Sequence, residues 1–98
     1  MKKVLDHRYV KRFEQIPNVG PRVARDFQTL GFTEPKELVG KDPYALYERL
    51  CTKTKVRHDP CLLDVFIAVT RFMSGESPRP WWHYTPERKK NYKRITRV

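Results

Sequence analysis

A chain of 98 residues is long enough for one domain with a modest hydrophobic core. Its longest uncharged apolar run, residues 65–70, is too short to cross a bilayer, and its two cysteines are too few for a disulfide scaffold. Lys and Arg outnumber Asp and Glu by 21 to 11, and the resulting net charge of +10 favours a polyanionic partner, nucleic acid above all. Because charged residues follow Leu5 before any signal-peptide core develops, we expect a cytoplasmic protein with reduced thiols.

The first part of the chain predicts two helices joined by a tight turn at residues 16–20. Gly20 is free to adopt a positive φ angle, and Asn18 is the next most tolerant residue type for such a position. Pro21 suits the start of a helix because it lacks an N–H group. We predict a first helix over residues 7–15 and a second over residues 21–30, closed by Gly31. Their apolar faces are formed by Tyr9, Val10, Phe13 and Ile16 and by Val23, Phe27 and Leu30.

Three helix starts in the middle of the chain are predicted by capping residues, two of which are followed directly by proline. Thr33 is expected to cap a short helix that ends at Gly40, and Asp42 caps a helix whose buried face includes Tyr47 and Leu50. Residues 52–58 carry basic side chains without apolar periodicity and are expected to be a loop. Asp59 then caps the most apolar helix, which ends at residues 74–75 and is expected to be enclosed by the others.

The C-terminal part differs in composition from the rest of the chain. Residues 76–98 contain seven Lys and Arg against two Glu, and hold half of the net positive charge. Pro78 and Pro80 predict an extended link, after which Thr85 is expected to cap a polar helix that packs weakly. We therefore divide the chain into a core domain at residues 1–75 and a Pro/Trp link with a basic C-terminal helix at residues 76–98. The predicted fold class is all-α, a compact domain of five or six helices.

The turn and the helix start after it resemble the helix-hairpin-helix motif, a SAM-like helical unit. In that motif the hairpin usually reads apolar-Pro-Gly-apolar-Gly and is followed by a basic residue; Asn18 stands here in place of the first Gly, and the matching residues are Ile16, Pro17, Val19, Gly20 and Arg22. The resemblance implies phosphate binding by backbone N–H groups, with little reading of base sequence. A helix start supplies unpaired donors and a partial positive charge, which suit an anion. The alternative is a turn that only connects two packed helices.

A longer run of the chain is similar to a small bacterial family named for a pathogenicity locus, also described as mitomycin-resistance-like. The similarity covers about residues 16–72 and rests on the hairpin, Glu37-Leu38, Asp42-Pro43, Leu46-Tyr47, Leu50-Cys51, Val56-Arg57 and residues 59–66, with Trp81-Trp82 matching a further element. The hairpin half also resembles the C-terminal domain of the competence regulator TfoX. These resemblances imply a compact helical domain and a DNA-related role, without a catalytic residue to carry over.

The basic residues divide into three groups that are candidates for contact with phosphate. We expect sequence-independent DNA binding, weakened by salt, through Asn18, Val19, Gly20, Arg22, Arg25, Lys53, Lys55, Arg57, Lys89 and Lys90. The alternative for each group taken alone is that its charges belong to an ordinary solvent-exposed surface that binds no ligand. Trp81 and Trp82 are candidates for base stacking, although at least one of them is expected to cover the core. The alternative function is a protein-interaction adaptor that docks a partner through the helical fold and residues 81–84.

The sequence offers little for catalysis, metal binding or a cofactor. The three histidines are single and far apart, and there is no nucleophile, paired-metal or phosphate-loop motif. A zinc site built from Cys51, His58, Cys61 and His83 would have an uncommon spacing, so buried free thiols are favoured. Lys53 and Asp59 follow the hairpin at positions that invite comparison with base-excising enzymes, but a chain of this size has little room for a base pocket between two groups of helices. We expect neither an enzyme, nor a cofactor, nor a membrane partner.

Overall fold

The computed structural model describes residues 1–92 as a helical domain with principal extents of 39 × 26 × 22 Å. Its described residues contain four α-helices and four 3₁₀ turns and no strand, so the all-α prediction is confirmed. The predicted count of five or six helices is wrong, because two of the expected helices form only 3₁₀ turns. The elements are η1 (His7–Tyr9), η2 (Phe13–Gln15), α1 (Pro21–Thr29), η3 (Pro35–Leu38), α2 (Pro43–Thr54), α3 (Pro60–Met73), η4 (Trp81–Tyr84) and α4 (Thr85–Asn91).

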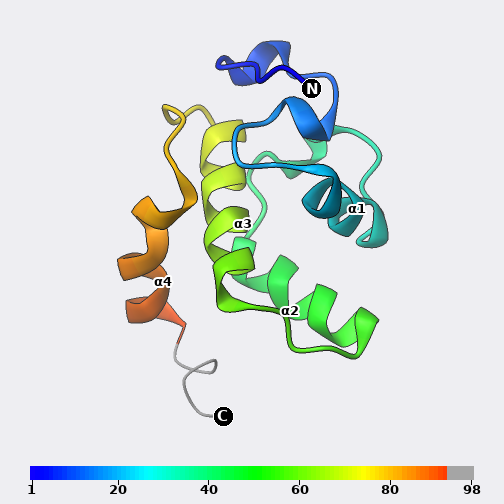
Figure 1. The fold of residues 1–98 in the computed structure, drawn as a ribbon, viewed down its shortest axis with the longest axis vertical. Coiled ribbons are helices and arrows are strands. Elements are labelled where there is room, and N and C mark those ends of the chain that lie inside the picture. Colours follow the sequence, from blue (N-terminus) through cyan, green and yellow to red (C-terminus); the bar gives the residue numbers. More distant parts are fainter. Residues whose placement is uncertain (93–98) are drawn as a thin grey trace.

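Helix α3 is the centre of the domain, as its apolar sequence predicts (Figure 1). Every residue from Leu63 to Thr70 is buried, so the helix is covered around its whole circumference. Phe66 stacks on Phe27 of α1 with ring centroids 5.1 Å apart, and Phe13 of η2 lies 5.5 Å from the same Phe27 ring. In Figure 1, α1 and α2 lie on one side of α3 and α4 lies on the other. The hairpin is therefore anchored to the core through aromatic contacts on both of its sides.

The predicted first helix over residues 7–15 does not form. Two 3₁₀ turns stand in its place, separated by extended backbone at Val10 and Arg12. The Gln15 side-chain oxygen accepts hydrogen bonds from the backbone N–H groups of Lys11 (2.8 Å) and Arg12 (3.0 Å), which holds the chain outside a helix. So short a segment gains few helical hydrogen bonds against the cost of nucleation. Tyr9, predicted on the apolar face, is 64% exposed.

The starts of α1, α2 and α3 lie where the proline signals predict them. Asp42 and Asp59 each accept a hydrogen bond from the backbone N–H two residues ahead, at 2.9 and 2.8 Å. Gly31 closes α1 with a φ of 96°, as expected. The predicted cap at Thr33 is wrong: the Glu37 carboxylate instead accepts from the backbone N–H groups of Thr33 and Glu34.

The predicted basic loop at residues 52–58 is shorter than expected. Helix α2 continues to Thr54, whose hydroxyl donates to the Leu50 carbonyl, and Lys55 ends the helix in the left-handed conformation, with a φ of 59°. Lys53 therefore lies on the last turn of α2, and only Lys55 and Arg57 lie in the loop.

The C-terminal segment packs against α3 through a buried ion pair that the sequence pattern did not reveal. The Arg88 Nε donates to Asp64 at 2.8 Å, and the side chain of Asp64 is fully buried in α3. Thr85, predicted as the cap of the last helix, is its first residue and donates its hydroxyl to Asp64 at 2.6 Å. Helix α4 ends at Asn91; Lys93 and Arg94, which the sequence predicts as part of this polar helix, lie outside the described residues.

None of the helices within residues 1–92 combines the length and the hydropathy that a membrane span requires.

Candidate functional site

The hairpin at residues 16–20 keeps its apolar side chains inward and its polar backbone outward. Ile16 and Val19 are buried, at 0% and 1% exposure, and the Val19 N–H donates to the Ile16 carbonyl at 3.1 Å. The positive φ of the turn belongs to Asn18 (75°), while Gly20 is extended with a φ of −101°. The expectation that Gly20 supplies the left-handed residue is wrong, because Asn18 takes that conformation itself. A Cβ atom added to Gly20 would meet no heavy atom within 4 Å.

The start of α1 presents three backbone donors that the described residues leave without a partner. Gly20 is the N-cap residue and has no side chain that could accept a hydrogen bond. The N–H groups of Gly20, Arg22 and Val23 donate to no acceptor within residues 1–92. Because Pro21 has no N–H, these groups are the complete set of free donors at this helix start. Together with the helix dipole they form an electropositive surface that is suited to a phosphate oxygen.

A lysine from the N-terminus stabilises the opposite, carbonyl side of the hairpin. The Lys3 ammonium donates to the carbonyl oxygens of Glu14 (2.9 Å), Ile16 (3.1 Å) and Val19. Burial lowers the pKa of Lys3, and the nearby Glu14 opposes that change. The Val4 N–H also donates to the Gln15 carbonyl at 2.9 Å, so the N-terminal segment holds the turn in one conformation. Sequence reasoning missed Lys3, since nothing in its spacing links it to the turn.

Asn18 connects the hairpin to residues 79–81, the segment that carries Trp81. Its Nδ2 donates to the Arg79 carbonyl at 2.8 Å, and its Oδ1 accepts from the Trp81 N–H at 3.2 Å. We predicted Asn18 as a contact to DNA, but its side-chain amide is engaged on both sides within the chain. The residue that departs from the usual hairpin glycine thus brings residues 79–81 beside the start of α1.

Two of the predicted cations lie next to the free amides. Arg22 and Arg25 are exposed on α1, one turn apart along the helix. Asp26 lies on the same helix, and burial raises its pKa, opposed by His58, Arg22 and Arg25. One Asp26 oxygen, Oδ2, is buried without a hydrogen-bond partner in the described residues. This carboxylate reduces the positive potential at the start of α1 whenever it is ionised.

The other predicted cations do not gather around the hairpin. Arg57 pairs with Glu48 at 3.1 Å and donates to the Tyr92 hydroxyl at 3.3 Å, while Lys53 and Lys55 are exposed at the C-terminal end of α2. Lys89 and Lys90 are exposed on α4, across α3 from α1 (Figure 1). The ten predicted site residues therefore occupy three separate regions of the surface.

An apolar groove of about 270 Å³ adjoins the free amides. Val23 of α1, Leu62 and Val65 of α3, and the half-buried Trp81 contribute the apolar lining. Arg22, His58, Asp59 and Cys61 complete the rim. Trp82 is 62% exposed, and its ring meets that of Trp81 edge-on with the centroids 5.5 Å apart. The expectation that one tryptophan covers the core is confirmed for Trp81, which packs on the core cluster.

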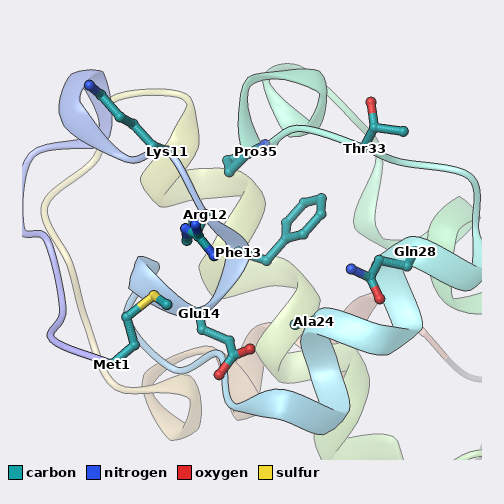
Figure 2. Close-up of a pocket in the computed structure, with 9 residues that line it drawn as sticks. All are labelled: Met1, Lys11, Arg12, Phe13, Glu14, Ala24, Gln28, Thr33 and Pro35. Carbon is teal, nitrogen blue, oxygen red and sulfur yellow. The ribbon is translucent and has the colours of Figure 1, made fainter.

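A second hollow, of about 190 Å³, lies between η2, α1 and η3 (Figure 2). Its lining carries the basic residues Lys11 and Arg12 and the acidic Glu14, and Figure 2 shows Lys11 extending away from the other residues. These side chains do not converge on a common point, so the hollow lacks the convergent polar groups of a ligand site.

The two cysteines are free thiols, with Cys51 buried and Cys61 exposed. Within residues 1–92 no three His, Cys, Asp or Glu side chains are grouped so that they could hold a metal ion.

Comparison with known proteins places the chain in a family. The model of the family described as "Pathogenicity locus" matches residues 6–90. The chain belongs to the pathogenicity locus family. It is also 49% identical over 73 residues to "Mitomycin resistance protein McrB" of Streptomyces lavendulae, a match that covers 74% of this chain and 70% of that protein. No solved structure matches the chain. The predicted resemblance to the pathogenicity locus family is thus confirmed, and its matched region includes the hairpin, the groove and the Asp64–Arg88 pair.

Proposed function

We propose that this protein binds DNA without sequence specificity, through the hairpin at residues 16–20 and the start of α1. The observation that carries the proposal is the group of free N–H donors at Gly20, Arg22 and Val23, flanked by the exposed side chains of Arg22 and Arg25. Backbone donors and long cations recognise phosphate oxygens and carry no information on base sequence. The net charge of +10 adds long-range attraction to the duplex.

Gly20 supports this assignment because the fold itself does not require glycine there. Its φ of −101° is accessible to any residue, and an added Cβ would have open space around it. A ligand that comes into contact with the backbone is a physical reason to keep this position free of a side chain. Gly20→Val is therefore expected to fold and to bind DNA more weakly, because the branched side chain holds a phosphate away from the amides.

The proposal is tested by fluorescence anisotropy with a labelled duplex over a range of salt concentrations. We expect affinity to fall with salt, with a slope of about −0.9 for each phosphate contacted. Arg22→Glu is expected to weaken binding and to reduce the magnitude of that slope by about 1. Lys41→Glu is the matched control, since it makes the same change of charge at an exposed loop position between η3 and α2, outside the hairpin and α1. Equal losses in both variants would assign binding to net charge alone and contradict the hairpin site.

A protein-interaction adaptor is the second candidate, and it is favoured by one observation. Trp82 is 62% exposed, and a large exposed aromatic ring is a common anchor at protein interfaces. In this case capture of a protein partner would be insensitive to salt and would be lost in Trp82→Ala, whereas Arg22→Glu would leave it unchanged.

A further inference from the structure

The apolar groove next to the hairpin is poorly explained by contact with duplex phosphates alone. Its lining combines Val23, Leu62, Val65 and Trp81 with a cation, Arg22, at the rim. Phosphate groups are charged and gain no contact with an apolar lining, whereas an unpaired base has an apolar face that is removed from water when the base enters a groove. Arg22 and Val23 belong both to the groove lining and to the set of free amides, so the two features form one continuous surface.

We propose that this surface binds an unpaired nucleotide of single-stranded DNA, with its phosphate at the start of α1 and its base in the groove against Trp81. The inference rests on the proposed function and names the form of nucleic acid that the site prefers. The basic character of Arg22 matches the phosphate, and the apolar lining matches the face of the base. A volume of about 270 Å³ lies below the range of pockets that enclose drug-sized ligands, so it suits one ring system.

Two contacts hold the groove in place before any ligand arrives. Asn18 fixes the backbone on both sides of Pro80 through its hydrogen bonds to Arg79 and Trp81. The Trp81 ring is half-buried against the core, and Trp82 meets it edge-on, leaving an exposed ring beside the groove on which a neighbouring base can stack. The surface is therefore preorganised, which lowers the entropic cost of ordering a flexible strand.

The only two tryptophans of the chain, Trp81 and Trp82, both lie at this site, so their emission reports on it directly. The probes are an oligo(dT) strand of about ten nucleotides and an abasic strand with the same number of phosphates. Oligo(dT) is expected to quench the emission and to bind about fivefold to a hundredfold more tightly than the abasic strand. The abasic strand is expected to bind with little quenching, because it supplies phosphates without bases.

A groove-filling variant separates this inference from the proposed function. Cys61 lines the groove and is exposed, so Cys61→Phe is expected to occupy the groove without removing core contacts. It should abolish the preference for oligo(dT) while leaving binding of the abasic strand intact. Thr52→Phe, at a position that is also exposed but lies outside the groove, is the control.

The outcomes are distinct. Equal affinity of the unmodified protein for the two strands, with binding that Arg22→Glu removes, would overturn the base groove and leave phosphate binding at the hairpin in place. Unchanged preference in Cys61→Phe would also overturn it. No binding of either strand at low salt would overturn both proposals and point to a protein ligand for the same groove.

Discussion

The buried pair between Asp64 and Arg88 should be the most sensitive point of this fold to substitution. The Asp64 carboxylate is fully buried, and Arg88 is its charged partner, at 2.8 Å from Nε and 3.4 Å from Nη2. In Arg88→Met the carboxylate would keep only the Thr85 hydroxyl, at 2.6 Å. Removing one member of a buried ion pair costs about 3–5 kcal/mol, a large part of the roughly 5–15 kcal/mol that stabilises an ordinary domain. For a domain of this size that loss corresponds to a fall in Tm of about 12 °C or more.

The assay is urea unfolding of Arg88→Met, with the double variant Asp64→Leu/Arg88→Met as its control. Replacing both members of a buried pair by apolar side chains is often close to neutral, so the double variant should recover most of the lost free energy of unfolding. A loss below about 1 kcal/mol in Arg88→Met would refute the reasoning, since it would mean that Asp64 finds solvent or another partner. Failure of the double variant to recover stability would contradict the pairing in the same way.

Further predictions follow from the other contacts. Lys3→Met removes the ammonium from the hairpin carbonyls and should cost about 1 kcal/mol in urea unfolding, with faster hydrogen exchange at Val19; unchanged exchange would contradict its role. Asn18→Ala should destabilise more than Asn18→Gly, since both lose the bonds to residues 79 and 81 but only alanine keeps the strained positive φ; equal unfolding midpoints would contradict this. Asp26→Asn should raise stability at neutral pH and tighten DNA binding, because it removes a desolvated charge from beside Arg22, and anisotropy with a duplex would detect the gain. Backbone hydrogen bonds lower the pKa of the Asp59 and Glu37 carboxyls in the folded protein. These carboxylates therefore stabilise the fold above the ordinary carboxyl pKa of about 4, and that stabilisation is lost as the pH falls through their lowered folded-state pKa values. Unfolding midpoints that stay constant from neutral pH to below about 4 would contradict this.

The sequence was most informative where local chemistry decides the structure. Asp42 and Asp59 cap the helices that they precede, because an aspartate followed by proline satisfies the helix start within three residues. The apolar run after Asp59 predicted the central helix, since only an enclosed position can bury such a sequence. Where competing local contacts win, the same reasoning failed: Gln15 bonds the N–H groups of Lys11 and Arg12, and the expected first helix is replaced by two turns.

The site was only partly predictable because its key contacts are distant in sequence. The hairpin and its arginines could be recognised from residues 16–25 alone. The contacts from Lys3 to the hairpin carbonyls and from Asn18 to residues 79–81 depend on tertiary packing and leave no pattern in the sequence. The groove arises from the same packing, since it combines side chains of α1, α3 and η4. Equally, the separation of Lys89 and Lys90 from the hairpin follows from the placement of α4, which the Asp64–Arg88 pair joins to α3.

The most direct test of phosphate binding at the hairpin is a titration of the ¹⁵N-labelled protein with duplex DNA, followed by ¹H–¹⁵N correlation spectra. If the account is right, the amide signals of Gly20, Arg22 and Val23 shift first and furthest, and Arg22→Glu suppresses these shifts at equal DNA concentration. Shifts confined to other parts of the chain, such as the end of α2 or the surface of α4, with the three hairpin amides unmoved, would contradict it.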